Sequence, residues 1–97
     1  MTPIHQKGHF YFDSQDPIYR DHFPGRPVVP GSLIMEAFLK IVEQKKIEPT
    51  AIGRFRFKRF VLPGTYAYEM VISTGMIDCT LLQTEETFAA GKILYGG

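Results

Sequence analysis

The chain has 97 residues, of which 44% are hydrophobic and 13% aromatic, and its formal net charge is +1. This length and composition predict a single globular domain over residues 1–97 and exclude a disordered chain. A charge so close to zero gives no general support for binding to nucleic acid or to a membrane surface. Because a domain of this size has a small core, burial against a second copy would add stability.

Cys79 is the only cysteine. An internal disulfide, a thiolate metal cluster and a CxxC redox motif are therefore excluded, and Cys79 is predicted to be a small core residue. The sequence has no apolar run of membrane-spanning length, and its first residues lack the apolar core of a signal peptide. We therefore expect a cytoplasmic protein.

The N-terminal region is predicted to be a short tail over residues 1–6 followed by a strand over residues 8–13. Aromatic side chains favour the strand, and the turn residues that follow it, 13–17, end it. His5 and His9 are expected on solvent or on a strand face, without a catalytic role.

Three prolines then recur at every third position, Pro24, Pro27 and Pro30. Each fixes its own φ, and a spacing of three matches the turn of a polyproline II helix. This pattern predicts a stiff strap that holds His22 at a defined place relative to Gly31. The alternative is an ordinary connector rich in turns.

The next segment predicts a buried helix that runs to about Lys46 and is apolar almost all round. Gly31 and Ser32 open it, and Ser32 is the predicted N-cap. The first turn of a helix presents unpaired N–H groups, and a glycine lets a ligand approach the backbone. Gly31 is therefore a candidate to donate a hydrogen bond to a thioester carbonyl, as in an oxyanion hole.

Glu36 lies in this apolar helix, and two interpretations of it remain open. A buried carboxyl group is disfavoured unless it is paired or protonated, so Glu36 is a candidate general acid. Glu36 and Lys40 are also spaced i, i+4 in the favourable order, which predicts an ordinary surface ion pair.

The second half of the chain predicts four strands, over residues 51–62, 65–73, 76–83 and 87–95. Pro63–Gly64 and Thr74–Gly75 are predicted hairpin turns. One strand and one helix followed by a four-stranded meander predict an α+β fold with an antiparallel sheet around the helix.

Alternation along the first of these strands separates aromatic from basic side chains. Phe55 and Phe57 are predicted to face the core, while Arg54, Arg56 and Lys58 share the other face. That basic face is either simply solvated or an attractive surface for an acidic carrier protein and its phosphate.

Two blocks of the sequence resemble a known family. HFPGRPVVPG at residues 22–31 is followed by LIMEAF at 33–38, and RFKR at 56–59 is followed by VLPG at 61–64. These blocks are similar to the signature of the β-hydroxyacyl-(acyl carrier protein) dehydratases of bacterial fatty-acid synthesis. The resemblance implies a hotdog fold, in which an antiparallel sheet wraps around one central helix.

The resemblance also implies a reaction and its residues. His22 would remove the α-proton of a 3-hydroxyacyl thioester, the Gly31 N–H would support the enolate-like oxygen, and protonated Glu36 would help the hydroxyl leave as water. The product would be a trans-2-enoyl thioester of fatty-acid or polyketide-like biosynthesis, made without a metal or an organic cofactor. Further residues implied to line the substrate site are Phe23, Gly25 and Val29.

The resemblance implies two kinds of partner. One is an acyl carrier protein with a phosphopantetheine-linked acyl chain, which would dock on Arg54, Arg56, Lys58 and Arg59. The other is a second copy of the chain, because in this family the histidine and the acid meet across a homodimer interface, and the dimers sometimes assemble further.

The sequence departs from the family at three points. It begins close to the strand before the first block, as expected of an N-terminally truncated member. Lys40 replaces a glutamine and would favour the ionised form of Glu36, and Asp21 replaces a glycine beside His22. An acyl-thioester hydrolase and a non-catalytic module that binds an acyl group or a carrier protein therefore remain as alternatives.

Overall fold

The structure is a computed structural model that describes residues 2–20 and 27–96. Its described part contains one α-helix, one short 3-10 helix and six strands. In chain order these are β1 (Ile4–Phe12), the 3-10 helix η1 (Pro17–Arg20), α1 (Gly31–Gln44), β2 (Pro49–Ile52), β3 (Arg56–Phe57), β4 (Gly64–Ser73), β5 (Met76–Gln83) and β6 (Glu86–Tyr95).

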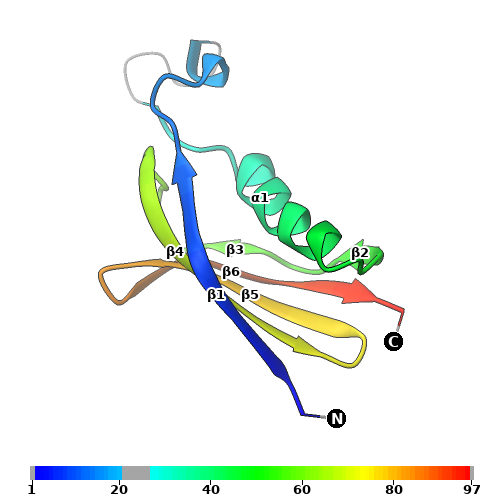
Figure 1. Cartoon of the computed structure of the whole chain (residues 1–97). Coiled ribbons are helices and arrows are strands. Elements are labelled where there is room, and N and C mark those ends of the chain that lie inside the picture. Colours follow the sequence, from blue (N-terminus) through cyan, green and yellow to red (C-terminus); the bar gives the residue numbers. More distant parts are fainter. Residues whose placement is uncertain (1, 21–26, 97) are drawn as a thin grey trace.

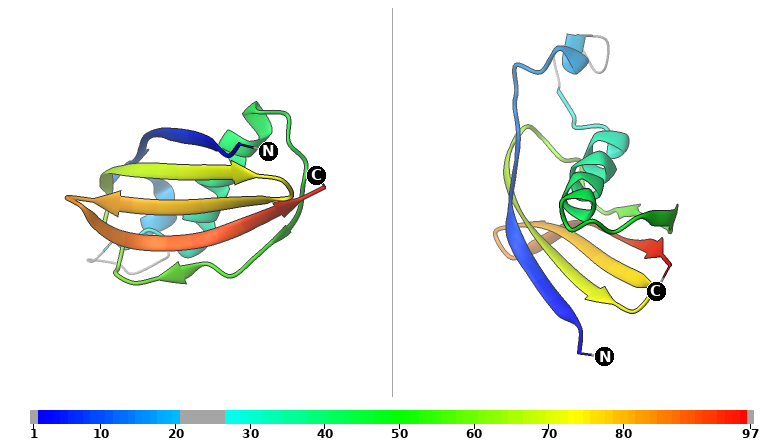
Figure 2. Two further views of the ribbon diagram at one scale, coloured as in Figure 1. Left: turned by 90° about the horizontal axis from the view of Figure 1, so that it is seen from below. Right: turned by 45° about the vertical axis from the view of Figure 1, so that its right-hand side comes forward.

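The strands form one antiparallel sheet in the order β1-β4-β5-β6-β2, and β3 also pairs with β6. The sheet is strongly curved and α1 lies against its inner side (Figure 1). A further view shows β1 beside β4, and the segment that carries β2 and β3 beside β6 (Figure 2). The predicted α+β architecture, with an antiparallel sheet around one helix, is confirmed.

The predicted meander is only partly correct. β4, β5 and β6 form it, with the predicted turn at Thr74–Gly75, but residues 51–62 do not pair with β4. They form two short strands along β6, because the Gly53 N–H donates to the Lys92 carbonyl at 2.7 Å and the Lys58 N–H donates to the Phe88 carbonyl at 2.8 Å. Pro63–Gly64 is therefore not the turn of a hairpin, and that prediction is wrong.

The prediction of an N-terminal tail over residues 1–6 is also wrong. β1 begins at Ile4 and pairs with β4 without interruption, from Ile4 opposite Ile72 to Phe12 opposite Gly64. The edge of the ten-residue strand β4 supplies hydrogen-bond partners along the whole of β1, and local sequence does not reveal a partner so distant.

α1 is amphipathic, contrary to the prediction that it is buried all round. Ile34, Phe38 and Val42 are buried against the sheet, whereas Glu36 and Lys40 are exposed. Residues four apart share a helix face, so the three buried side chains form one stripe and the opposite stripe remains accessible.

The helix termini also differ from the predicted ones. The N-cap is Pro30, whose carbonyl accepts hydrogen bonds from the N–H groups of Leu33 and Ile34, so the prediction of Ser32 as N-cap is wrong. At the other end, α1 stops at Gln44, before the predicted end at Lys46, where the backbone has a φ of 59°. This left-handed conformation ends a helix.

The core is centred on Phe38, whose side chain is completely buried. The Phe38 ring meets the ring of Phe10 edge-on, with centroids 5.0 Å apart, and that of Tyr68, with centroids 6.1 Å apart. Burial of a phenylalanine side chain contributes roughly 1.5–3 kcal/mol. Cys79 is buried in the same core, as predicted.

Gly91 leaves the space that Phe55 fills. A Cβ atom at Gly91 would overlap the Phe55 ring, which is partly buried and lies 6.1 Å from the Phe38 ring between centroids. We therefore expect Gly91→Ala to lower the free energy of unfolding by about 1–3 kcal/mol in urea denaturation. Gly96→Ala, with no atom near the new methyl group, is the neutral control. Equal stability of the two variants would contradict this packing.

The buried thiol of Cys79 makes stability depend on alkaline pH. Burial, with a smaller effect of the Asp78 carboxylate, raises the pKa of this thiol from 9.0 to about 12. The unfolded chain loses the proton near pH 9 and the folded chain near pH 12, so the stabilisation is complete below pH 9 and decreases from pH 9 to 12. We expect the free energy of unfolding to fall by about 1.4 kcal/mol per pH unit in that range.

Urea denaturation between pH 9 and 10 measures this effect below the ordinary pKa of tyrosine, 10.0. Cys79→Ala should lack the slope that the thiol causes, although the variant is less stable throughout. A slope that persists unchanged in Cys79→Ala would refute the assignment.

Candidate active site

The two sequence blocks meet through one backbone hydrogen bond. The Val29 N–H donates to the Val61 carbonyl at 2.7 Å, and both side chains are buried. The Tyr66 hydroxyl donates to the Leu62 carbonyl at 2.9 Å and accepts from the Leu62 N–H at 3.1 Å. Burial raises the pKa of Tyr66, although its hydrogen bond to Leu62 partly offsets this. The residues that lead into α1 are thus held against the segment that follows β3.

Gly31 lies in the wall of an apolar hollow of about 310 Å³, the Gly31 hollow, at the beginning of α1. A Cβ atom at Gly31 would lie 2.8 Å from the ring of Phe57, so glycine permits this close contact. The first N–H groups of an α-helix have no acceptor within the helix, so the Gly31 N–H is available to a ligand. Other residues that line the Gly31 hollow are Val28, Val29, Pro30, Ile34, Arg59, Phe60 and Val61.

Glu36 is exposed, and its carboxylate lies 3.7 Å from the Lys40 ammonium; the two side chains are 58% and 68% exposed. The prediction of a buried Glu36 is therefore wrong, and the alternative of a surface ion pair is confirmed. Both residues line a second hollow of about 350 Å³, the Glu36 hollow, together with Asp13 and Asp16 from the segment after β1.

Gly31 and Glu36 are not brought together within one chain. They line different hollows, because five residues of α-helix correspond to a rotation of about 140° around its axis. Val29 lines the Gly31 hollow, whereas its role in a substrate site stays a prediction.

Three predicted site residues, His22, Phe23 and Gly25, lie outside the described residues. The last part of the proline strap is described. Pro30 has φ −61° and ψ 145°, which is the predicted polyproline II conformation.

Among the four predicted carrier-binding residues, the structure sets Arg59 apart from Arg54 and Arg56. Arg54 and Arg56 are exposed and line a hollow on the outer side of the sheet, and Lys58 is exposed after β3. The Arg59 guanidinium instead lies 2.9 Å from the Glu86 carboxylate and lines the Gly31 hollow.

Sequence analysis missed the exposed apolar side chains at and near the Gly31 hollow. Phe57 and Phe60 line the hollow and are 45% and 79% exposed, and Leu62, just after its lining residue Val61, is 56% exposed. The available signal was the apolar run of residues 60–62 before Pro63–Gly64. This run resembles the end of a strand, and its side chains would then be predicted to be buried.

No group of three or more His, Cys, Asp or Glu side chains able to hold a metal ion occurs in residues 2–20 and 27–96. In the same part of the chain, α1 is too short and too polar to cross a membrane.

A single helix held inside a curved antiparallel sheet defines the hotdog class of proteins. The family model of the ApeI-like family, described as ApeI dehydratase, matches residues 4–91. The chain therefore belongs to the ApeI-like dehydratase family, as the resemblance implied.

Curated relatives match a smaller part of the chain. The 3-hydroxyacyl-[acyl-carrier-protein] dehydratase FabZ of Proteus mirabilis is 43% identical over an alignment that covers 50% of this chain and 41% of that protein. FabZ of Yersinia enterocolitica is 39% identical over 50% of this chain and 36% of that protein. The matched region thus spans less than half of each relative.

Solved structures support the fold over the whole chain. A chain of the dehydratase heterocomplex ApeI:P from Xenorhabdus doucetiae matches with a TM-score of 0.70 and 18% identity, covering 100% of both chains. An uncharacterised protein from Erwinia carotovora matches with a TM-score of 0.62 and 19% identity, over 95% of this chain and 81% of that one.

The exposed position of Glu36 predicts that its removal leaves the fold intact. We expect Glu36→Gln and Lys40→Gln each to change the free energy of unfolding by less than ~0.5 kcal/mol, because an exposed i, i+4 pair contributes little. Phe38→Ala, on the buried face of the same helix, should cost about 3–5 kcal/mol. A cost of several kcal/mol for Glu36→Gln in urea denaturation would show that Glu36 is buried.

Proposed function

We propose that this chain dehydrates 3-hydroxyacyl thioesters, carried by an acyl carrier protein, to trans-2-enoyl thioesters. Membership of the ApeI-like dehydratase family and the similarity to FabZ proteins support this activity. The observation that carries the proposal is the open N-terminus of α1 in an apolar hollow, where Gly31 meets the Phe57 ring. The reaction belongs to fatty-acid or polyketide-like biosynthesis and takes place in the cytoplasm.

The chemistry needs a base, an oxyanion donor and an acid. His22 takes the proton from the α-carbon, and the Gly31 N–H donates to the thioester oxygen that gains negative charge. The bond between the β-carbon and the hydroxyl oxygen breaks, and that oxygen leaves as water with the proton of Glu36. The electron pair of the broken C–H bond forms the new double bond. Proton exchange with solvent then restores both side chains, so neither a metal nor an organic cofactor is needed.

We propose that each site combines residues from two copies of the chain. Gly31 and Glu36 line different hollows of one chain, so they act on one substrate only if Glu36 comes from a second chain. The exposed Phe60 and Leu62 are apolar surface that such a partner would cover. A homodimer would also bring the Glu36 face of α1 beside the partner's Gly31 hollow, as the acid role requires.

The acyl carrier protein is the proposed second partner. Arg54, Arg56 and Lys58 are exposed and form no ion pair within residues 2–20 and 27–96, so they are available to an acidic surface. Arg59 contributes less to this docking, because Glu86 already neutralises it.

A non-catalytic binding module is the second candidate. The ion pair between Lys40 and Glu36 favours it, because Lys40 already contacts the carboxyl group that the acid role would direct at the leaving hydroxyl group. Such a module would keep the apolar hollow and the carrier-binding surface without turnover.

Mass spectrometry of a 3-hydroxyacyl thioester, on carrier protein and on coenzyme A, tests the activity. We expect the wild-type chain to remove one water and His22→Ala and Glu36→Gln each to lose at least about 100-fold in rate, as for a missing general acid or base. The better substrate identifies the carrier. An unchanged substrate at every chain length would support the binding module, and release of free thiol would support a thioester hydrolase.

A mixture of the two inactive variants tests the shared site. If His22 and Glu36 come from different copies, each mixed dimer keeps one intact site, so mixing restores activity. Activity that stays absent after exchange of subunits has been verified would place both residues of a site in the same chain.

A further inference from the structure

The hydroxyl group of Tyr66, on β4, serves a residue outside the sheet. It donates to the Leu62 carbonyl at 2.9 Å and accepts from the Leu62 N–H at 3.1 Å. Leu62 lies in the segment between β3 and β4, where the backbone has left the strand ladder. Backbone N–H and carbonyl groups need hydrogen-bond partners, and a single side chain supplies both of them for Leu62.

The core fixes the ring that carries this hydroxyl group. Tyr66 is 3% exposed, and its ring meets the ring of Phe88 on β6 edge-on, with centroids 5.2 Å apart. The ring of Phe12 on β1 lies 6.0 Å away between centroids. Pro63 follows Leu62 and restricts its backbone to extended conformations. The position of Leu62 is therefore tied to the sheet by a rigid side chain.

Leu62 is connected to the beginning of α1 through few flexible bonds. Its neighbour Val61 accepts the hydrogen bond from the Val29 N–H at 2.7 Å. Only Pro30 separates Val29 from Gly31, and its ring fixes the φ angle, which is −61°. A displacement of Leu62 would therefore also move the Gly31 N–H.

Tyr66 does not line the Gly31 hollow, whereas Phe60 and Val61, in the segment next to Leu62, do. Any effect of its hydroxyl group on a substrate in this hollow is therefore indirect. Such an effect can still be large, because an oxyanion donor acts only when it is already in place, and a displacement of about 1 Å can lower a rate roughly 100-fold.

We propose that Tyr66 is a positioning residue for the oxyanion donor. Its hydroxyl group holds Leu62 and thereby keeps the Gly31 N–H directed at the thioester oxygen. The inference deepens the proposed function and rests on it for the identity of the reaction. Tyr66→Phe tests it, because this variant keeps the ring in the core and loses both hydrogen bonds to Leu62.

Tyr68→Phe is the matched control. Tyr68 lies two residues further along β4, on the same side of the sheet, and is 4% exposed. Its hydroxyl group accepts a hydrogen bond from the Gln6 side-chain amide at 3.2 Å. Both variants therefore remove one hydrogen-bonded hydroxyl group from the same strand, but only Tyr66→Phe releases the segment beside the Gly31 hollow.

Amide hydrogen exchange of the full chain, followed by NMR, tests the positioning without turnover. We expect the Val29 N–H to exchange about tenfold faster in Tyr66→Phe than in the wild type, because its hydrogen bond to Val61 opens more often. In Tyr68→Phe the change should be less than about twofold beyond any general loss of stability.

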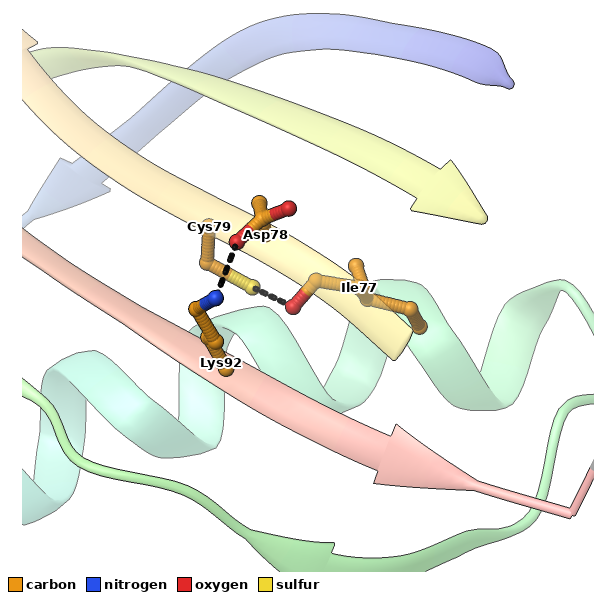
Figure 3. Close-up of polar contacts among 4 residues, drawn as sticks. All are labelled: Ile77, Asp78, Cys79 and Lys92. Carbon is orange, nitrogen blue, oxygen red and sulfur yellow. Dashed lines mark hydrogen bonds and ion pairs between the residues drawn. The ribbon is translucent and has the colours of Figure 1, made fainter. Parts of the chain in front are cut away.

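The middle of β5 is the internal reference, because this strand pairs with β4 on one side and with β6 on the other. Figure 3 shows two contacts there: the Lys92 ammonium lies 3.7 Å from the Asp78 carboxylate, and the Cys79 thiol donates to the Ile77 carbonyl at 3.9 Å. Neither contact involves the segment that Tyr66 holds. The amides of Asp78 and Cys79 therefore report global unfolding and should exchange equally fast in the two variants.

Two exchange results would overturn the proposal. One is an unchanged exchange rate of the Val29 N–H in Tyr66→Phe. The other is an increase by the same factor as for Asp78 and Cys79, which would show a general loss of stability.

Turnover of a 3-hydroxyacyl thioester tests the consequence for catalysis. We expect kcat of Tyr66→Phe to fall about tenfold with KM within about twofold of the wild type, because a misplaced oxyanion donor weakens interactions made in the transition state. Tyr68→Phe should keep both constants within about twofold. Wild-type kcat in Tyr66→Phe, or an equal fall in both variants, would contradict the positioning role.

The two measurements separate this inference from the proposed function. A wild-type chain that leaves the thioester unchanged would count against the dehydratase activity. The exchange rate of the Val29 N–H would then still decide whether Tyr66 holds the residues that lead into α1.

Discussion

The hydrogen bond from the Val29 N–H to the Val61 carbonyl decides where the candidate site forms. Val61 follows β3, which pairs with β6. The hydrogen bond therefore holds the residues that lead into α1 at a fixed position relative to the sheet. The Tyr66 hydroxyl holds the neighbouring Leu62 at both its N–H and its carbonyl. The place of Gly31 against Phe57 therefore depends on contacts between segments far apart in the chain.

Local patterns predicted the elements whose boundaries are set locally. β5 has the predicted limits, Met76–Gln83, and Thr74–Gly75 forms the predicted turn because Gly75 takes a positive φ of 78° at no steric cost. Residues 4–7 and 51–62 were predicted wrongly for one common reason. Their structure is set by pairing with β4 and β6, and a single sequence carries no direct signal for the choice of a distant partner.

The same difference between local and distant contacts explains which features of the candidate site could be predicted from the sequence. The spacing of Glu36 and Lys40 allowed both a buried acid and a surface pair, and only the packing of Phe38 into the sheet decides that Glu36 faces outward. Alternation correctly placed Arg54 and Arg56 on one face. It could not show that Arg59 would meet Glu86, because that contact joins the segment after β3 to the beginning of β6.

The pairing of β1 with β4 has a consequence for folding during synthesis. β1 leaves the ribosome before its partner β4, which ends at Ser73, so β1 stays unpaired while α1, β2 and β3 are being made. Such non-local pairing slows folding, because the chain loses entropy when the intervening loop closes, before the strand contacts contribute any stabilising free energy. Until then the aromatic side chains of β1 have no core, and α1 has no sheet on which to pack, which is the stage at which nascent chains associate wrongly.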